Sequence, residues 1–362
     1  MLNGHGGNIF GMAHRLGCDP SDIIDMSSNV NPLGPPSGLA SYLRDNIQTI
    51  AALPEVDAQS AVEAFSGRFD IDPGCVAPGN GTTQFIYTIP RALETRRALI
   101  VGPTYADYAD ACLMHDVPYD FLLTRESDAF TLDMDALQER IKGYDTVFIC
   151  NPNNPTGTLI PVADLERLCD THPETVFIID ESYLPFADGA GKESMMRRGL
   201  PNAVVLNSMS KLFRVPGLRI GFLISSPAVI ERFRTFFLPW NVNCLAQAAV
   251  KYLMTRTAEI DIFVENTLIF FEKERHLMLR RFKDASHINF FPSTTSFLLA
   301  RLYGDLTADR VSDILARDRI LIRNCANFKG LSDRFVRISL QTSEINQMAA
   351  ERLLTLTQVK SP

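Results

Sequence analysis

SMSKLFRVPGLRIG, residues 208–221, is the most distinctive segment of this sequence. Its lysine, Lys211, follows two serines and precedes an arginine, Arg219, by eight positions. A lysine amine can form a Schiff base with an aldehyde cofactor, and an arginine presents a fork of donors that matches phosphate oxygens. A lysine in an ordinary surface loop would not require the continuation PGLRIG. The segment therefore predicts a site that combines Schiff-base chemistry with phosphate binding.

Short apolar runs upstream of this segment predict a parallel sheet. They alternate with amphipathic stretches such as residues 162–170, in which Leu165 and Leu168 are three positions apart with charges between them. Strands that alternate with helices form parallel sheets covered on both faces, and ligands bind beyond the carboxyl ends of such strands. Polar or turn-forming residues directly follow each of the expected strands, which are residues 98–101, 146–150, 176–179 and 203–206.

The texture of the chain changes near residue 251. A long charged helical segment, residues 263–284, is followed by short expected strands at 297–301, 320–322 and 336–340. The first 40 residues are rich in Gly, Asn, Ser and Pro. We therefore expect three parts. They are an N-terminal segment (1–40) that lies over the active site and packs with the small domain, a large α/β domain (41–250) and a small C-terminal α+β domain (251–362).

Composition excludes several classes of protein. The 362 residues carry a net charge of -7 with no basic run, which argues against a nucleic-acid partner. No apolar run approaches the roughly 20 residues that span a bilayer, and the N-terminus does not resemble a signal peptide. The seven cysteines are scattered without a CxxC pair, so neither a disulfide framework nor a metal site is expected. We expect a cytoplasmic protein.

Two further motifs directly follow expected strands. NPNNPTG, residues 151–157, is more specific than a turn requires, although Asn, Pro and Gly are ordinary turn formers. DESY, residues 180–183, begins with a carboxylate that can pair with a protonated pyridine nitrogen, and Tyr183 can hydrogen-bond a ring hydroxyl. Taken alone, Asp180 could equally cap a helix.

GNGTT, residues 79–83, precedes an apolar periodic run over 85–93. Glycines before a helix leave backbone N–H groups free to bind an anion. A dinucleotide fingerprint would need glycine where Gln84 stands, and the P-loop-like GAGKES at 189–194 has Phe186 in place of a required glycine. We interpret the latter as a loop. PTY, residues 103–105, offers Tyr105 for stacking on a flat ring.

These motifs, in this order, resemble the fold type I pyridoxal-phosphate (PLP) enzymes of the class I and II aminotransferase group over nearly the whole chain. The resemblance implies an aspartate-aminotransferase-like fold: a large domain with a mostly parallel sheet covered by helices, plus a smaller α+β domain. It implies Lys211 as the Schiff-base lysine and Asp180 on the pyridine nitrogen, with Tyr183 as the third catalytic residue. The other implied cofactor-binding residues are Gly81, Thr82, Thr83, Tyr105, Asn154, Ser208, Ser210 and Arg219. Arg337 matches the family arginine that binds the substrate carboxylate.

Both ends of the chain narrow the resemblance. HGGN (5–8), SNVNPLG (28–34), PWNVN (239–243) and RNCANFKGL (323–331) are similar to the threonine-phosphate decarboxylases of cobalamin biosynthesis. Histidinol-phosphate aminotransferases share NxNPxG and the core motifs but, as a rule, neither HGGN nor RNCxNFxGL. We favour PLP-dependent decarboxylation of threonine phosphate. A histidinol-phosphate-type aminotransferase and a non-catalytic PLP-binding homologue remain alternatives.

The surplus of anion-binding groups predicts a small phosphorylated amino acid as the substrate. Beyond the residues needed for the cofactor phosphate, His5, Asn31, Arg323 and Arg337 remain to bind a carboxylate and a second anion. Alternatively, Arg323 lies on the surface or pairs with an acid such as Asp333. The resemblance also implies a homodimer with a shared active site.

Three positions depart from the family pattern. Leu53 stands where a tyrosine usually reaches the partner subunit's cofactor phosphate, Ser296 replaces an asparagine, and Gln341 begins an atypical stretch after the arginine strand.

Overall fold

A computed structural model describes residues 6–187 and 193–356 of the chain. Its larger sheet has seven strands in the order β2-β8-β7-β6-β5-β3-β4. Neighbouring strands from β7 to β4 run parallel, whereas β8 is antiparallel to both β7 and β2. The strands are β2 (Val76–Gly79), β3 (Ala98–Gly102), β4 (Tyr119–Leu123), β5 (Thr146–Cys150), β6 (Val176–Asp180), β7 (Ala203–Ser208) and β8 (Gly221–Ile224).

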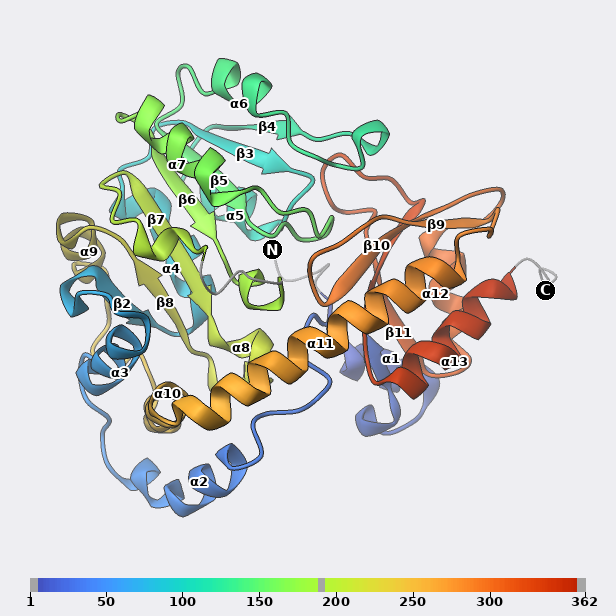
Figure 1. Cartoon of the computed structure of the whole chain (residues 1–362), viewed down its shortest axis with the longest axis horizontal. Coiled ribbons are helices and arrows are strands. Elements are labelled where there is room, and N and C mark those ends of the chain that lie inside the picture. Colours follow the sequence, from blue (N-terminus) through green and yellow to red (C-terminus); the bar gives the residue numbers. More distant parts are fainter. Residues whose placement is uncertain (1–5, 188–192, 357–362) are drawn as a thin grey trace.

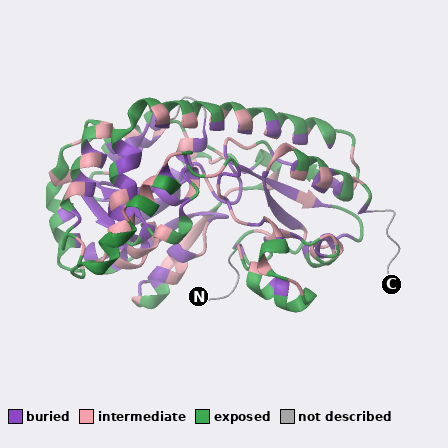
Figure 2. Ribbon diagram, turned by 90° about the horizontal axis from the view of Figure 1, so that it is seen from below, coloured by how far each residue is buried: buried purple, intermediate pink, exposed green. Residues whose placement is uncertain are grey.

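The central strands are apolar because both faces of the sheet are covered by helices. Every residue of β3, β5 and β7 is buried, and Figure 2 shows buried residues on the strands with exposed residues on the outer helix faces. The covering helices surround the sheet in Figure 1. They are α3 (Gln59–Phe69), α4 (Gly81–Ala92), α5 (Asp107–Met114), α6 (Met134–Arg140), α7 (Val162–Thr171), α9 (Pro227–Arg234) and α10 (Cys244–Thr255).

The smaller sheet joins the two ends of the chain. Its order is β1-β11-β12-β10-β9, where β1 is parallel to β11 and the remaining pairs are antiparallel. The strands are β1 (Ile24–Met26), β9 (Ile288–Phe290), β10 (Phe297–Leu302), β11 (Ile320–Asn324) and β12 (Phe335–Ser339). A strand close to the N-terminus is therefore an edge strand of a sheet built otherwise from the last quarter of the chain.

Helices complete this part of the molecule. They are α1 (Ile9–Leu16), α12 (Ala308–Ala316) and α13 (Ser343–Leu354). The 25-residue α11 (Thr257–Arg281) extends from the larger sheet to the smaller one (Figure 1). It begins earlier than the expected residue 263. The start of the helix was not predicted because its first turn, TAEI, carries no long apolar run that would mark it in the sequence. Two short helices remain, α2 (Leu39–Asp45) and α8 (Met209–Leu212).

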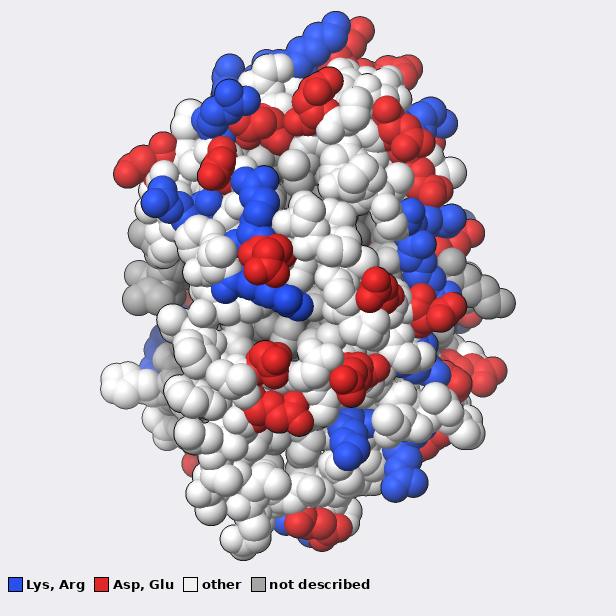
Figure 3. All heavy atoms as spheres, turned by 90° about the vertical axis from the view of Figure 1, so that its left-hand side faces the viewer, with Lys and Arg blue, Asp and Glu red and all other residues white. Residues whose placement is uncertain are grey.

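The predicted α/β class with a mostly parallel sheet is confirmed. In the described part of the chain, no helix has the length and apolar character needed to cross a membrane. On the face shown in Figure 3, acidic and basic side chains are interspersed, and no continuous basic area is visible.

Candidate active site

The carboxyl ends of the parallel strands border a small cavity of about 90 Å³, which we call the aspartate cavity. All of the residues predicted to bind the cofactor line it: Gly81, Thr82, Thr83, Tyr105, Asn154, Asp180, Tyr183, Ser208, Ser210, Lys211 and Arg219. Three residues that the sequence did not single out also line it, namely Tyr108, Cys150 and Ser182. The structure thus brings together residues that are up to 138 positions apart in the chain, from Gly81 to Arg219.

Asp180, the last residue of β6, lines this cavity and is held by two hydrogen bonds. Its Oδ1 accepts a hydrogen bond from the Ser182 backbone N–H (2.9 Å), and its Oδ2 accepts one from the Tyr108 hydroxyl (2.8 Å). Asp180 as a residue is 4% exposed, so these two donors fix the orientation of its carboxylate and partly replace water. A buried carboxylate in this position can pair with a cation bound in the cavity.

Tyr108 is a functional candidate that the sequence analysis missed. It is fully buried and stacks on Phe148 with ring centroids 5.4 Å apart, while Tyr105 meets it edge to face at 5.9 Å. Burial, followed by the negative Asp180, raises the pKa of the Tyr108 hydroxyl well above its ordinary value, so the hydroxyl remains a donor. The only sequence signal was its spacing of three from Tyr105, which is also common in helix cores.

Another group of residues that line the cavity is suited to an anion. Gly81, the first residue of α4, has φ +73, and a Cβ on it would lie 2.6 Å from Arg219 Nη2. A Cβ on Gly221 would lie 2.7 Å from the Thr82 backbone nitrogen. The two glycines therefore let the arginine and the N-terminus of α4 approach each other. Backbone N–H groups at a helix start and a guanidinium together form a phosphate site.

Lys211 lies on α8 and lines the same cavity. Burial, with smaller contributions from the positive charges of Arg337 and Arg219, lowers its pKa to about 8, while Asp180 acts in the opposite direction. A nucleophilic amine must be neutral, so this lysine is closer to its reactive form at neutral pH than an ordinary lysine.

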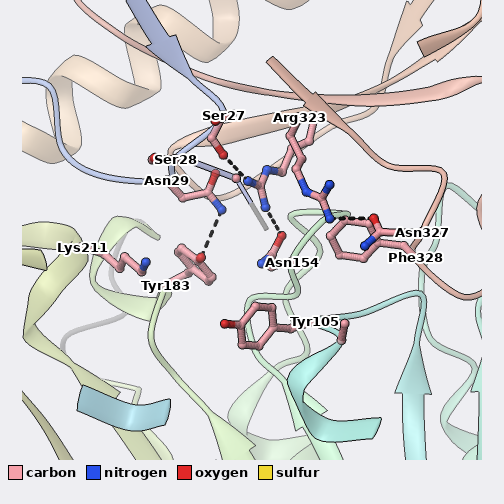
Figure 4. Close-up of a pocket in the computed structure, with 13 residues that line it drawn as sticks. Ser27, Ser28, Asn29, Tyr105, Asn154, Tyr183, Lys211, Arg323, Asn327 and Phe328 are labelled. Atoms are coloured by element: carbon pink, nitrogen blue, oxygen red, sulfur yellow. Dashed lines mark hydrogen bonds between the residues drawn. The ribbon is translucent and has the colours of Figure 1, made fainter. Parts of the chain in front are cut away.

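A second cavity, of about 160 Å³, adjoins the first; we call it the two-arginine cavity. The cavities share Tyr105, Asn154, Tyr183 and Lys211 as lining residues. Figure 4 shows Lys211, Tyr183 and Asn154 below Arg323, with Tyr105 beneath. Its two arginines come from neighbouring strands of the smaller sheet, because Arg323 on β11 and Arg337 on β12 are directly opposite in the ladder.

Arg337 is 4% exposed and linked to both cavities. Its Nη1 donates to Asn154 Oδ1, its Nη2 donates to the Ser27 carbonyl (2.5 Å), and its guanidinium lies 5.2 Å from the Phe297 ring centroid. Among the described residues its Nε has no hydrogen-bond partner. Burial lowers its pKa. A buried guanidinium bound only by neutral groups is ready to receive an anion.

Arg323 is likewise held by neutral groups. Its Nη1 donates to the Asn324 carbonyl and its Nη2 to Asn327 Oδ1, both at 2.6 Å, and it lies 4.9 Å from the Phe328 ring centroid. Burial lowers its pKa to about 10, and Arg337 adds to that shift. The alternative partner, Asp333, lies 4.0 Å from Arg334 instead.

Asn31 does not line either cavity, contrary to its predicted place beside the substrate. Its amide donates to the Leu212 carbonyl and to Thr267 Oγ1, both at 3.0 Å, and its Oδ1 accepts from the Leu33 N–H. Its own backbone N–H donates to the Lys211 carbonyl (3.0 Å). With no exposed surface, Asn31 anchors the chain next to the lysine rather than contacting a ligand.

One further predicted substrate residue, His5, and the three positions that depart from the family pattern remain to be placed. His5 lies outside the described residues, although the adjacent Gly6 lines the two-arginine cavity. Leu53 is 73% exposed, and the Ser296 hydroxyl is buried without a partner among the described residues. Gln341 donates from its side chain to the Asp25 carbonyl (2.8 Å) and thus ties β1 to the end of β12.

Comparison with known proteins decides the family. Residues 21–353 match the family described as aminotransferase class I and II. The chain belongs to this family. It is 31% identical to the threonine-phosphate decarboxylase of Salmonella typhimurium, over 97% of this chain and 94% of that protein. It is 29% identical to an adenosylcobalamin biosynthesis bifunctional protein of Leptospira interrogans, over 95% of this chain but only 40% of that longer protein.

Among solved structures, the histidinol-phosphate aminotransferase from Clostridium acetobutylicum superimposes with a TM-score of 0.85 at 26% identity, covering 93% of this chain and all of that one. Because the family and these relatives are PLP-dependent decarboxylases and aminotransferases, this family member is a PLP-dependent enzyme.

The residues of the aspartate cavity fit this cofactor. Lys211 supplies the amine, Asp180 the anion for a pyridine nitrogen, and Tyr105 an aromatic ring. Arg219 and the start of α4 would bind the cofactor phosphate, where the missing Cβ of Gly81 leaves room.

Proposed function

We propose that this enzyme decarboxylates L-threonine O-3-phosphate, or a similar phosphorylated amino acid, as a step of cobalamin biosynthesis. The observation that supports this best is that Arg323 and Arg337 line the same cavity as Lys211. Each of the two arginines is hydrogen-bonded to neutral groups. An ordinary amino acid presents one carboxylate. Two adjacent cations that form no ion pair with any described residue favour a substrate with two anionic groups.

The two arginines are assigned to different anionic groups of the substrate. Arg337 is the more buried and contacts Asn154, which lines both cavities, so we assign it to the carboxylate near the cofactor. Arg323, steadied by Asn327 and Phe328, is assigned to the phosphate. Arg presents a rigid fork that suits both groups.

Residue geometry decides which substrate bond reacts. When bound, PLP supplies an electron sink that accepts the electron pair of the broken bond. Asp180 would keep the ring nitrogen of bound PLP protonated, and the arginines would fix the angle at which each bond of the substrate Cα is presented to the cofactor. A strong Arg337–carboxylate pair stabilises the ground state, so it serves decarboxylation mainly by fixing that angle. Removal of the Cα proton by Lys211 would instead lead to transamination, the alternative that the Clostridium structure represents.

One assay separates these outcomes. Purified holoenzyme is given L-threonine O-3-phosphate and followed for carbon dioxide, and in parallel histidinol phosphate with 2-oxoglutarate and followed for glutamate. We expect carbon dioxide in the first and no glutamate in the second. Glutamate formation without carbon dioxide would replace the decarboxylase by the aminotransferase. Turnover of neither, with a normal cofactor band, would favour a non-catalytic homologue.

We also propose that the enzyme is a homodimer. Five exposed apolar side chains come from two segments joined by a hydrogen bond from the Trp240 N–H to the Val56 carbonyl (3.0 Å). Their exposed fractions are 61% for Ile50, 73% for Leu53, 52% for Val56, 74% for Leu238 and 47% for Trp240. Exposed apolar patches mark protein contacts, and two-fold dimers are the commonest assembly.

This proposal is tested by sedimentation. Leu238→Asp should shift the protein toward the monomer, whereas Ile269→Asp, an equally apolar exposed position on α11, should not. A dimer that survives Leu238→Asp at micromolar concentration would place the contact elsewhere.

A further inference from the structure

A chain of buried hydrogen bonds leads from the smaller sheet to the aspartate cavity. The Ser339 hydroxyl, at the end of β12, donates to Asn29 Oδ1 (2.6 Å), and Asn29 Nδ2 donates to the Tyr183 hydroxyl (3.1 Å, Figure 4). The exposed fractions of Ser339, Asn29 and Tyr183 are only 1%, 3% and 7%. Hydrogen bonds thus connect three distant parts of the polypeptide: Ser339 and Asn29 are 310 positions apart, and Asn29 and Tyr183 are 154 positions apart.

The direction of these two hydrogen bonds determines where the hydroxyl proton of Tyr183 points. An amide nitrogen only donates, so the Tyr183 oxygen accepts from Asn29 and its own proton must go to another acceptor. Tyr183 lines the aspartate cavity beside Asn154 and Lys211, and the proton is therefore available to an oxygen bound there. If the amide were reversed, Asn29 Oδ1 would take that proton and the cavity would lose a donor.

We propose that Asn29 is a positioning residue that keeps the Tyr183 hydroxyl donating into the cofactor cavity, with Ser339 holding the amide in the required orientation. This rests on the proposed role of Tyr183 toward the ring hydroxyl of PLP. Ser339 then donates to Asn29, Asn29 donates to Tyr183, and Tyr183 donates into the cavity, so the bonds all run in one direction and strengthen one another.

The same residue connects the two cavities. Asn29 also lines the two-arginine cavity, and its neighbour Ser27 accepts a hydrogen bond from Arg337. Gln341, just beyond β12, holds the Asp25 carbonyl. The position of Asn29 is therefore set by the sheet that carries both arginines, so the orientation of the tyrosine proton depends on the packing of that sheet.

The test is a spectrophotometric pH titration of the visible cofactor band in the holoenzyme without substrate. Removing a donor from the ring oxygen leaves more negative charge beside the lysine–cofactor linkage, which then holds its proton more tightly. Tyr183→Phe should raise the midpoint by about one pH unit. Asn29→Asp should raise it by a similar amount, because a carboxylate accepts the tyrosine proton. Ser339→Ala should raise it by less.

Two variants serve as controls. Ser339→Thr keeps the hydroxyl and should retain the wild-type midpoint. Ser225→Ala removes another buried serine hydroxyl bond, to the Ala203 carbonyl (2.7 Å), far from this chain, and should leave the midpoint unchanged.

A wild-type midpoint in Asn29→Asp, with Tyr183→Phe shifted, overturns the positioning role. If Asn29→Asp does not fold, Ser339→Ala decides by the same criterion. A wild-type midpoint in Tyr183→Phe overturns the inference as well, but leaves the decarboxylase proposal intact, because that proposal is tested by the products formed from threonine phosphate.

Discussion

The aspartate cavity and the two-arginine cavity share a wall but are assembled differently. The first is built around the ends of strands of the larger sheet, and its lining residues all lie between residues 79 and 221. The second joins a segment near the N-terminus to β11 and β12, and the contact from Arg337 to Ser27 spans 310 positions. A cavity at the edge of a regular sheet needs only local motifs, whereas one made by two chain ends depends on how a second sheet packs. We therefore expect the two cavities to respond differently to substitution.

The largest expected effect is in the first cavity. Lys211→Ala should abolish both the visible cofactor band and turnover, because Lys211 is the one lysine among the described residues that line either cavity. Borohydride reduction of the wild-type holoenzyme followed by peptide mapping should place the label on Lys211. Lys251→Ala, on the exposed side of α10, is the matched control and should retain the band. A label on any other lysine would end the assignment.

The next effect should separate the cavities. Arg323→Ala should weaken binding of threonine phosphate by about 2–5 kcal/mol, the scale for removing one partner of a buried charge pair, while leaving the visible band almost unchanged. Arg319→Ala, one position before β11 and paired with Asp22 at the surface (3.0 Å), should alter neither property. Steady-state kinetics and an absorbance scan of the same samples provide both readouts. Unaltered kinetics in Arg323→Ala would remove it from the substrate site.

A smaller effect concerns the pH dependence of Lys211, whose pKa is affected by an arginine of the two-arginine cavity. The pKa of Lys211 is lowered to about 8, first by burial and then by Arg337 and Arg219. The rate of PLP uptake by the apoenzyme should therefore rise about tenfold per pH unit below pH 8, as the neutral amine increases, and level off above it. Arg337→Gln should move the plateau to higher pH, since it removes one positive charge. A rise that continues to pH 10 in the wild type would show that Lys211 is an ordinary lysine.

The contrast between the cavities also explains what could be predicted from the sequence. Strand ends such as Asp180 and Ser208 were predictable, because a strand followed by a polar residue in a parallel sheet has only one place to put it. Asn31 was not: its motif indicated a ligand contact, but its amide instead binds Leu212 and Thr267 on distant elements. The role of Tyr108 was not predicted, because a buried helix tyrosine looks the same in sequence whether or not its hydroxyl donates to a carboxylate. Three-dimensional partners decide such roles, and local patterns do not contain them.

The smallest expected effect tests whether Tyr108 belongs to the aspartate cavity for its hydroxyl or only for its ring. Tyr108→Phe keeps the stacking on Phe148 but removes the donor to Asp180, which leaves one oxygen of a buried carboxylate short of a partner. The free energy of unfolding should fall by about 1–3 kcal/mol, and kcat should fall a few-fold because the carboxylate is less firmly oriented.

Tyr144→Phe is the matched control, since it removes a tyrosine–carboxylate hydrogen bond of the same length (2.8 Å) to Asp120. The Asp120 side chain is 40% exposed and also binds Arg97, so water and the arginine can replace the lost donor. This variant should lose less stability in chemical denaturation and no activity. Equal losses of stability in both variants would mean that burial around Asp180 adds nothing to the bond. Wild-type stability and kcat in Tyr108→Phe would mean that Tyr108 contributes to the cavity through packing alone.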